Sequence, residues 1–252
     1  MKILLCGLNG HMGQEVVRLA GSGCRGAVVS AGVDAVSPVS SADIPCAASY
    51  AAADPNVDCI IDFSHHSATK ELLAFACAHR LPLVLCTTGQ TPEELELIHA
   101  AGDKIPLFFS ANMSVGVALL VELARITAAT FPDAEIEIVE KHHDRKIDAP
   151  SGTALMIANA IREVRPSATT HCGRSGQGKR TPEEIGIHAI RMGNIVGEHE
   201  VLVGTPNQTI TLKHEAHSRA LFAEGALAAA EWLIGKPAGL YNMNDLIRNE
   251  GT

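Results

Sequence analysis

Short apolar runs alternate with segments of helical periodicity along the N-terminal part of the chain. Runs of this length, bounded by turn residues, are typical of buried strands. The expected strands are residues 2–6, 27–34, 57–63, 83–86 and 105–109. The expected helices are residues 14–20, a segment that ends near 79, and a segment that begins after Thr91-Pro92. Strands that alternate with helices predict a doubly wound parallel sheet with right-handed crossovers.

The pattern changes after Met113. Residues 134–140 alternate apolar and acidic side chains, which is typical of a strand with one solvent-facing side. Helices are expected near 115–129, at about 152–164 and, on an alanine-rich stretch, at 219–234. A mobile loop is expected at 173–180, and antiparallel strands are expected at 187–191, 197–203 and 208–214.

These patterns predict an α/β chain of two domains. Residues 1–113 and 219–252 are expected to form a Rossmann-like domain around the doubly wound parallel sheet. Residues 114–218 are expected to form an α+β domain with an open mixed or antiparallel sheet.

Composition excludes several classes of function. The formal net charge is −8, whereas nucleic-acid binding needs a concentrated basic surface. No apolar run is long enough to cross a bilayer, so no membrane partner is expected. The seven cysteines include no Cys-x-x-Cys pair, which favours reduced thiols and a cytoplasmic protein. No metal is expected, because His142 and His143 lack the further ligands that a four-coordinate site requires.

A glycine turn follows the first expected strand. Gly7, Gly10 and Gly13 recur at every third residue before a helix, with Asn9 where the commonest fingerprint has its second glycine. Glycines allow a tight turn and let the backbone approach a pyrophosphate, which the free amides of a helix N-terminus attract. The turn therefore predicts a dinucleotide site.

Asp34 ends the next expected strand, where a ribose-binding carboxylate belongs. The alternative is that Asp34 only caps a turn. Ala35 follows it, and no lysine or arginine lies near to accept the 2′-phosphate of NADPH. The sequence therefore favours NADH and gives no reason for a preference for NADPH.

Further polar turns fall at the same edge of the predicted sheet. Thr87-Thr88-Gly89 follows one strand, and its place favours contact with the nicotinamide over a simple turn and cap. His65-His66 follows another strand. A histidine pair in such a turn is more often a solvated loop or a helix cap than an acid–base device, and we expect the former.

The run from Glu140 to Thr153 is the richest in chemistry. It contains adjacent imidazoles at His142 and His143, with Lys146 shortly after them. Imidazole exchanges protons near neutral pH, and a desolvated lysine can do the same. Ser151, Gly152 and Thr153 open an expected helix, whose first amides can bind a carboxylate. The alternative is a solvated charged loop followed by an N-cap.

Several motifs occur in the order found in one family. They are Gly7–Gly13, Asp62-Phe63-Ser64, Thr87-Thr88-Gly89, Ala111–Val117, Glu140–Thr153 and Arg191–His199. On these motifs the chain closely resembles the dihydrodipicolinate reductases of the diaminopimelate route to lysine, nearly from end to end. The run Glu-x-His-His-x-x-Lys-x-Asp-Ala-Pro-Ser-Gly-Thr is specific to that family.

The resemblance implies roles for individual residues. His142 takes the position of the general acid/base and Lys146 that of a second proton donor. His143, Gly152 and Thr153 match substrate-binding positions, to which the helix start adds Ser151. The implied cofactor residues are Gly7, Leu8, Asn9, Gly10, His11, Met12, Asp34, Cys86, Thr87, Thr88, Ser110, Ala111, Asn112 and Met113.

The resemblance also implies the reaction and the partners. The reaction is an NAD(P)H-dependent reduction of a cyclic unsaturated dicarboxylate, and the assembly is a homotetramer formed through the sheet of the second domain. The first domain then binds the dinucleotide, and the two domains close on hinges near Ser114 and Arg219.

Three positions depart from the family pattern. His11 and Ala35 stand where many relatives have arginine, which removes positive charge from the adenosine side. Cys86 stands where glycine is common, and we expect it to add bulk near the nicotinamide. Two other functions remain open: another two-domain NAD(P)-dependent amino- or hydroxy-acid dehydrogenase, and a dinucleotide sensor without turnover.

Overall fold

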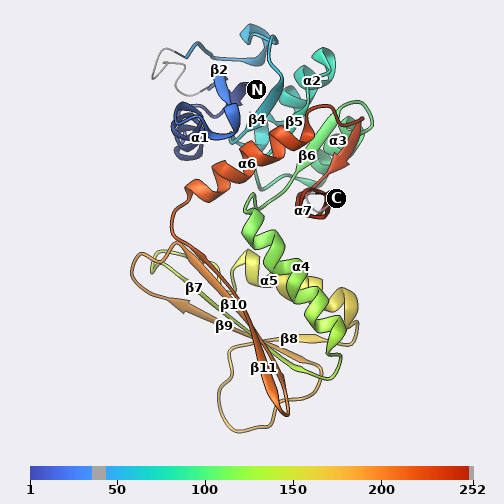
Figure 1. Ribbon diagram of the computed structural model, residues 1–252. Coiled ribbons are helices and arrows are strands. Elements are labelled where there is room, and N and C mark those ends of the chain that lie inside the picture. The colour runs from blue at the N-terminus through green and yellow to red at the C-terminus, as the bar shows by residue number, and fades with distance from the viewer. Residues whose placement is uncertain (36–43, 250–252) are drawn as a thin grey trace. The chain divides into compact units, whose positions relative to one another are not determined.

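The computed structural model describes residues 1–35 and 44–249. The chain divides into two compact units, one of Met1–Ser114 with Ala220–Thr252 and one of Val115–Arg219 (Figure 1). We name them the cofactor unit and the catalytic unit after the roles that the sequence predicts for them. No helix in the described ranges is long and apolar enough to span a membrane.

The cofactor unit contains a seven-stranded sheet in the order β12-β6-β5-β4-β1-β2-β3, with every neighbouring pair parallel. Its strands are β1 (Lys2–Cys6), β2 (Val28–Val33), β3 (Cys46–Ala47), β4 (Cys59–Asp62), β5 (Leu83–Leu85), β6 (Pro106–Phe109) and β12 (Gly239–Tyr241). Its α-helices are α1 (His11–Gly21), α2 (Thr69–His79), α3 (Pro92–Gly102), α6 (Ala220–Leu233) and α7 (Met243–Asn249).

Helices cover both faces of this sheet, which confirms the predicted doubly wound architecture. Leu4 and Cys6 pack on one face in a core with residues of α2 and α3. Helix α6 contacts α1 and the strands β4, β5 and β6. The central strands β1, β4 and β5 are buried on both faces, and they are therefore nearly continuous apolar runs.

Two glycines of the turn are required by packing. Gly7 has φ +76°, and a Cβ there would lie 2.5 Å from the carbonyl oxygen of Phe63 on the next strand. A Cβ on Gly13 would lie 2.1 Å from the carbonyl oxygen of Gly7. The start of α1 therefore approaches the turn closely, and this contact places the turn at the carboxyl edge of the sheet.

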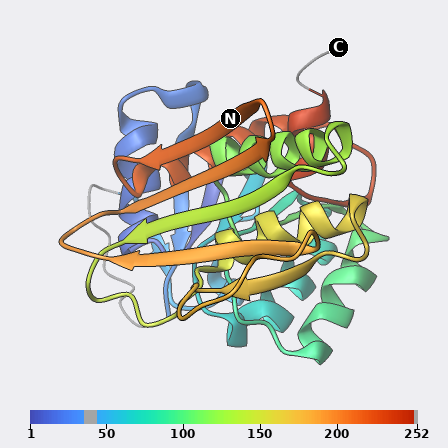
Figure 2. The ribbon, with the colours of Figure 1, turned by 90° about the horizontal axis from the view of Figure 1, so that it is seen from below.

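The catalytic unit contains a five-stranded mixed sheet in the order β11-β10-β7-β9-β8 (Figure 2). Its elements are α4 (Val115–Thr130), β7 (Glu135–His142), α5 (Gly152–Val164), β8 (Thr169–Cys172), β9 (Glu184–Arg191), β10 (Gly197–Thr205) and β11 (Gln208–Ala216). Helices α4 and α5 and the inward side chains of β7, β9 and β10 form one core. The mixed sheet predicted for this part of the chain is confirmed.

The expectation that the strand at 187–191 is antiparallel is wrong. This segment belongs to β9, which runs parallel to both β7 and β8. The reason is that two connections, α5 after β7 and residues 173–183 after β8, each return the chain to the same end of the sheet, which allows parallel pairing. The short strands β3, β8 and β12, which lie at sheet edges, were not predicted.

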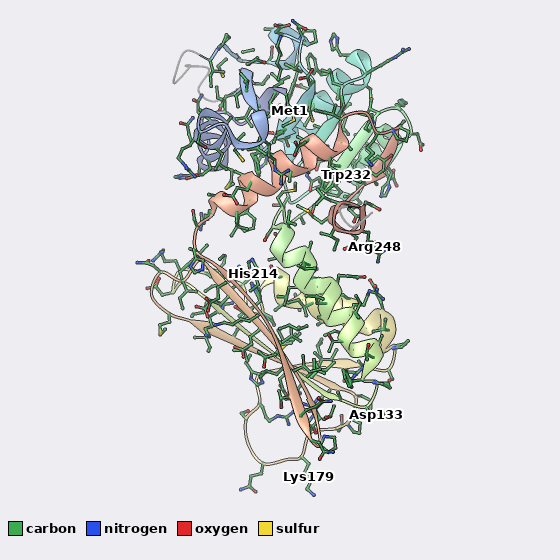
Figure 3. The ribbon with its side chains drawn as sticks, viewed as in Figure 1. Met1, Asp133, Lys179, His214, Trp232 and Arg248 are labelled. Carbon is green, nitrogen blue, oxygen red and sulfur yellow. The ribbon has the colours of Figure 1, made fainter. Side chains whose placement is uncertain are left out.

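Gly13→Ala tests the contact between the turn and α1. We expect it to lower the free energy of unfolding by about 1–3 kcal/mol, because the added methyl group has no room. Gly21→Ala, at the end of the same helix, is the matched control, since a Cβ there meets nothing within 4 Å. That variant should be neutral or stabilising by up to about 1 kcal/mol. Urea unfolding, followed by the fluorescence of the single tryptophan, Trp232 (Figure 3), measures the stability of both variants. Equal stability of the two variants would contradict the expectation.

Candidate active site

The period of β7 brings two polar side chains into the core of the catalytic unit. Ile136 and Ile138 face inward, and the same parity turns Glu140 and His142 inward as well. The register places Glu140 opposite His199 on β10, and His142 opposite Arg191 on β9. The inward side chains of three neighbouring strands therefore meet near the carboxyl end of β7.

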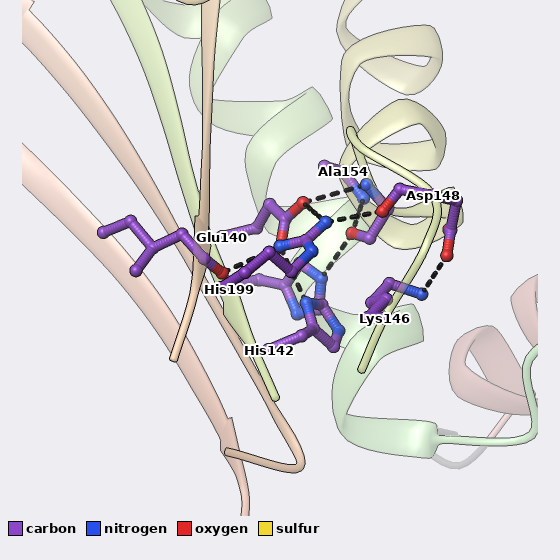
Figure 4. Close-up of polar contacts among 9 residues, drawn as sticks. Glu140, His142, Lys146, Asp148, Ala154 and His199 are labelled. Atoms are coloured by element: carbon purple, nitrogen blue, oxygen red, sulfur yellow. Dashed lines mark hydrogen bonds and ion pairs between the residues drawn. The ribbon is translucent and has the colours of Figure 1, made fainter. Parts of the chain in front are cut away.

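Glu140 is the centre of this cluster and is fully buried. Arg191 donates to both carboxylate oxygens at 2.8 Å, and the Ser151 amide donates to Oε1 at 3.0 Å. His142 Nδ1 lies 2.6 Å from Oε2 (Figure 4). Burial raises the pKa of Glu140, but the hydrogen bonds from His142, Arg191 and Ser151 outweigh it and lower the pKa to about 2. Glu140 is therefore an ionised acceptor at neutral pH.

His142 is held by this carboxylate at one ring nitrogen only. An ionised acceptor at Nδ1 requires a proton on that nitrogen and leaves Nε2 as the position for exchange. Gly197 lies beside the ring, since a Cβ on that residue would be 3.1 Å from Nε2. The strand expected at 134–140 extends further, because His142 is the last residue of β7 and is 9% exposed.

The ring of His199 packs against that of His142, and His199 is also buried. The two rings meet edge to face with centroids 5.2 Å apart. Burial and the neighbouring His142 lower the pKa of His199 to about 4, so its ring is neutral at neutral pH. Its Nε2 lies 3.1 Å from the hydroxyl of Ser151, which also accepts the Ala154 amide as the N-cap of α5. Neutral His199 therefore supports the start of that helix.

The segment after β7 carries the remaining predicted residues of this unit. Lys146 forms an ion pair with Asp148 at 2.8 Å, and the Asp148 carbonyl accepts from Arg191 at 2.6 Å. Burial and the nearby positive charge of Arg145 lower the pKa of His143. Gly152 and Thr153 form the first turn of α5. A helix start, a lysine and two imidazoles thus belong to one short stretch of chain, as predicted.

In the cofactor unit, a cleft of about 630 Å³ opens at the carboxyl ends of β1, β2 and β4. Its lining includes Gly7, Asn9, Gly10, Asp34 and Ala35. The Asn9 amide donates to Asp34 Oδ2 at 3.0 Å, so this carboxylate also holds the glycine turn. Asp34 therefore supports the turn and lines the cleft, and its binding of a ribose stays a prediction.

The other predicted cofactor residues occupy different places at the same sheet edge. The side chain of Leu8 is buried in the core, whereas His11 and Met12 begin α1. Residues 86–88 follow β5, and residues 110–113 follow β6. None of these residues is among those that line the cleft.

The thiol of Cys86 points into the protein core and not toward solvent. Burial raises the pKa of Cys86 well above its ordinary value, and the residue is 7% exposed. The expectation that Cys86 adds bulk near a nicotinamide stays a prediction.

A buried carboxylate lies under this edge and was not predicted to have a role. Asp62 accepts hydrogen bonds from the hydroxyls of Ser64 and Thr87, each at 2.5 Å. Burial raises the pKa of Asp62.

The His65-His66 pair has a structural role. The side chain of His65 accepts a hydrogen bond from the Ser67 amide as a helix cap, which confirms the interpretation of this pair as a cap.

Sequence reasoning missed Glu140, Arg191 and His199 as site residues. A signal existed for Glu140, because the two-residue period that turns Ile136 and Ile138 inward also reaches it. The same period turns His199 inward with Val201 on β10. No local signal identified Arg191, whose role depends on the parallel pairing of β9 with β7.

Comparison with known proteins gives consistent results. Residues 1–113 match the family model "dihydrodipicolinate reductase, N-terminus", and residues 116–247 match "dihydrodipicolinate reductase, C-terminus". A 4-hydroxy-tetrahydrodipicolinate reductase of Caldanaerobacter subterraneus is 45% identical over 98% of both chains. That of Clostridium tetani is 42% identical over 99% of this chain and 98% of its own.

Solved structures agree in fold. A dipicolinate-bound dihydrodipicolinate reductase from Paenisporosarcina sp. TG-14 aligns with a TM-score of 0.81 at 25% identity, over 97% of this chain and 98% of that one. An amine dehydrogenase from Mycobacterium smegmatis aligns with a TM-score of 0.63 at 9% identity, over 97% and 95% of the two chains. The second likeness is one of fold alone.

His199 should make stability depend on pH. Its pKa falls from 6.5 in the unfolded chain to about 4 in the fold, so the unfolded state binds more protons between these values. The free energy of unfolding is therefore highest above pH 6.5 and decreases as the pH falls toward 4. Between pH 7.5 and 5, wild type should lose about 2 kcal/mol more than His199→Gln, as measured by urea unfolding with circular dichroism. Parallel losses in the two proteins would contradict this expectation. Glu140 does not interfere, because its depressed pKa contributes only below about 4.5.

Proposed function

The chain belongs to the dihydrodipicolinate reductase family, and on that premise we propose which of its residues carry out the reaction. Its activity is that of a 4-hydroxy-tetrahydrodipicolinate reductase, an NAD(P)H-dependent oxidoreductase of the diaminopimelate route to lysine. The cyclic unsaturated dicarboxylate is reduced to tetrahydrodipicolinate. The family assignment sets aside the two alternatives, another two-domain NAD(P)-dependent amino- or hydroxy-acid dehydrogenase and a dinucleotide sensor without turnover.

His142 is the general acid of the reduction. The observation that carries this assignment is the 2.6 Å contact between its Nδ1 and the buried Glu140, which leaves Nε2 free to deliver a proton. When bound, the reduced nicotinamide supplies the hydride, and the charge that develops on the substrate must be neutralised. A positioned imidazolium contributes about 10²- to 10⁴-fold in rate at such a step.

The substrate carboxylates bind to the segment after β7 and to the start of α5, at Lys146, His143, Ser151, Gly152 and Thr153. The start of α5 offers backbone amides at positive potential, and the Ser151 side chain holds the cap in place. Lys146 already forms an ion pair with the carboxylate of Asp148. A substrate carboxylate can replace Asp148 as the partner of Lys146. Lys146 is then also placed as the second proton donor.

The cleft of the cofactor unit fits a dinucleotide. Its volume lies in the range of ligand pockets, and the Gly7–Gly10 turn presents backbone where a pyrophosphate can approach. The Asp34 carboxylate can accept hydrogen bonds from the ribose hydroxyls. Residues 86–88 and 110–113, at the ends of β5 and β6, would hold the nicotinamide half.

The same cleft favours NADH over NADPH. The described residues that line it include the carboxylates of Asp34 and Glu71 but no lysine or arginine. A 2′-phosphate would bring further negative charge to this surface without a cationic partner. Ala35 offers no side chain that could compensate.

The family resemblance also leads us to propose a homotetramer and a cytoplasmic location. The sheet of the catalytic unit supports the first, because α4 and α5 pack on it while β8 and β11 keep many exposed residues. All seven cysteines are free thiols, which supports a reducing compartment.

His142→Ala separates catalysis from cofactor binding. We expect kcat to fall about 10²- to 10⁴-fold because the proton donor is lost, with the Kd for NADH unchanged within about twofold. Steady-state oxidation of NADH, with substrate generated by the upstream synthase, and fluorescence titration measure the two quantities. His99→Ala, an exposed histidine on α3, is the control and should match wild type. Equal loss of turnover and of NADH affinity would refute the proposed division between the units.

Asp34→Asn tests the ribose carboxylate. The variant keeps an oxygen that can accept the Asn9 amide but loses the charge that strengthens the bonds to the ribose hydroxyls. We expect the Kd for NADH to rise about tenfold, the Kd for NADPH to rise less or to fall, and kcat at saturating NADH to remain. Asp54→Asn, outside the cleft lining, is the control. An unchanged NADH affinity in Asp34→Asn and Asp34→Ala would remove this residue from the site.

A further inference from the structure

Glu140 connects the proposed proton donor, the start of α5 and, through Arg191 and Asp148, Lys146. Its Oε2 contacts Nδ1 of His142 at 2.6 Å, and its Oε1 accepts the Ser151 amide, where α5 begins, at 3.0 Å. Arg191 extends the connection, since it donates to both oxygens of Glu140 and to the carbonyl of Asp148. Asp148 in turn pairs with Lys146. One buried carboxylate therefore contacts the acid directly and reaches the second donor through two residues.

The hydrogen-bond directions around Glu140 are fully determined. Three of its four contacts come from groups that can only donate: the two guanidinium nitrogens of Arg191 and the amide of Ser151. The fourth partner, His142, must then also donate from Nδ1, because a fully buried carboxylate has only acceptor oxygens. The neutral ring that remains after His142 gives up a proton is thus the Nδ1–H tautomer.

We propose that Glu140 is a positioning residue of this reductase, which with Arg191 fixes His142 so that only Nε2 exchanges a proton, and which sets the start of α5 relative to that nitrogen. This inference rests on the proposed role of His142 and extends it. Glu140 does not touch substrate in this arrangement. It acts through the ring that it orients and through the helix start that it holds.

The chain provides a matched comparison on the other side of the same strand. Glu137 also pairs with an arginine and a histidine, Arg180 at 2.6 Å and His188 at 3.0 Å. Its side chain is 27% exposed, however, and it contacts none of the proposed catalytic groups. Loss of its charge should therefore reproduce any general damage to the sheet without the effect on His142.

Glu140→Gln is the test, because the amide has the same shape and one oxygen fewer. Arg191 donates to both oxygen positions of Glu140, so the amide nitrogen of the variant would face a donor in either orientation. At the Oε1 position the nitrogen would face two donors, Arg191 and the Ser151 amide. The Oε2 position is therefore preferred, because there the nitrogen can donate to Nδ1 of His142. The ring must then accept at Nδ1, which opposes both the imidazolium and the Nδ1–H tautomer.

We expect Glu140→Gln to lower kcat about 100-fold, with the Kd for NADH within twofold of wild type. The ¹⁵N chemical shifts of the His142 ring at alkaline pH should report Nδ1–H in wild type and Nε2–H in the variant, which a merely structural role would not produce. Glu137→Gln should retain wild-type kcat and leave the His142 signals unchanged. Glu140→Asp keeps the charge that compensates Arg191 but not the reach to Nδ1, and should fold with kcat reduced at least tenfold.

The inference is overturned if Glu140→Gln keeps kcat within threefold of wild type, or if His142 keeps its Nδ1 proton in that variant. It is also overturned if Glu137→Gln loses as much activity as Glu140→Gln. If Glu140→Gln does not fold, a wild-type kcat in Glu140→Asp overturns the inference instead. His142→Ala, measured in parallel, separates the two levels: full activity there refutes the role of His142 itself, whereas an inactive His142→Ala with an active Glu140→Gln refutes only the role of Glu140.

Discussion

A carboxylate removed completely from water constrains the catalytic unit more than any other interaction. Burying a charge costs several kcal/mol unless hydrogen bonds and an opposite charge compensate it. Glu140 meets this requirement only when Arg191, His142 and the Ser151 amide all reach it. The register of β7 with β9 and the start of α5 must therefore be correct together. The same condition that makes the fold stable therefore also aligns His142, the proposed proton donor, with the helix start proposed to bind an anion.

The division into two units separates two chemical tasks. The cofactor unit presents a glycine turn and Asp34 at a cleft, whereas the catalytic unit carries the proposed acid and the proposed anion-binding groups. The chain passes from one unit to the other after Ser114 and after Arg219. The hinges expected near these two residues stay a prediction.

The sequence predicted those parts of the structure that depend on local pattern. The glycine turn, the parallel strands and the helix that begins at Gly152 all follow from periodicity and capping, which are properties of neighbouring residues. Arg191 could not be assigned in this way, because its contact with Glu140 spans 51 positions and depends on the parallel pairing of β9. Glu140 and His199 were accessible in principle, since extending the alternation of β7 and β10 turns both inward.

Cys86 illustrates how a departure from a family pattern can leave a site intact. Glycine at this position would leave the backbone open to a ligand, and a side chain aimed at the sheet edge would narrow that space. The thiol is instead packed among core residues, close enough to Asp62 for that carboxylate to raise its pKa further. The neighbouring Thr87 keeps its hydroxyl on Asp62. The substitution therefore changes the core beneath the edge, and the proposed contact of residues 86–88 with the nicotinamide half of the cofactor would be made by their backbone.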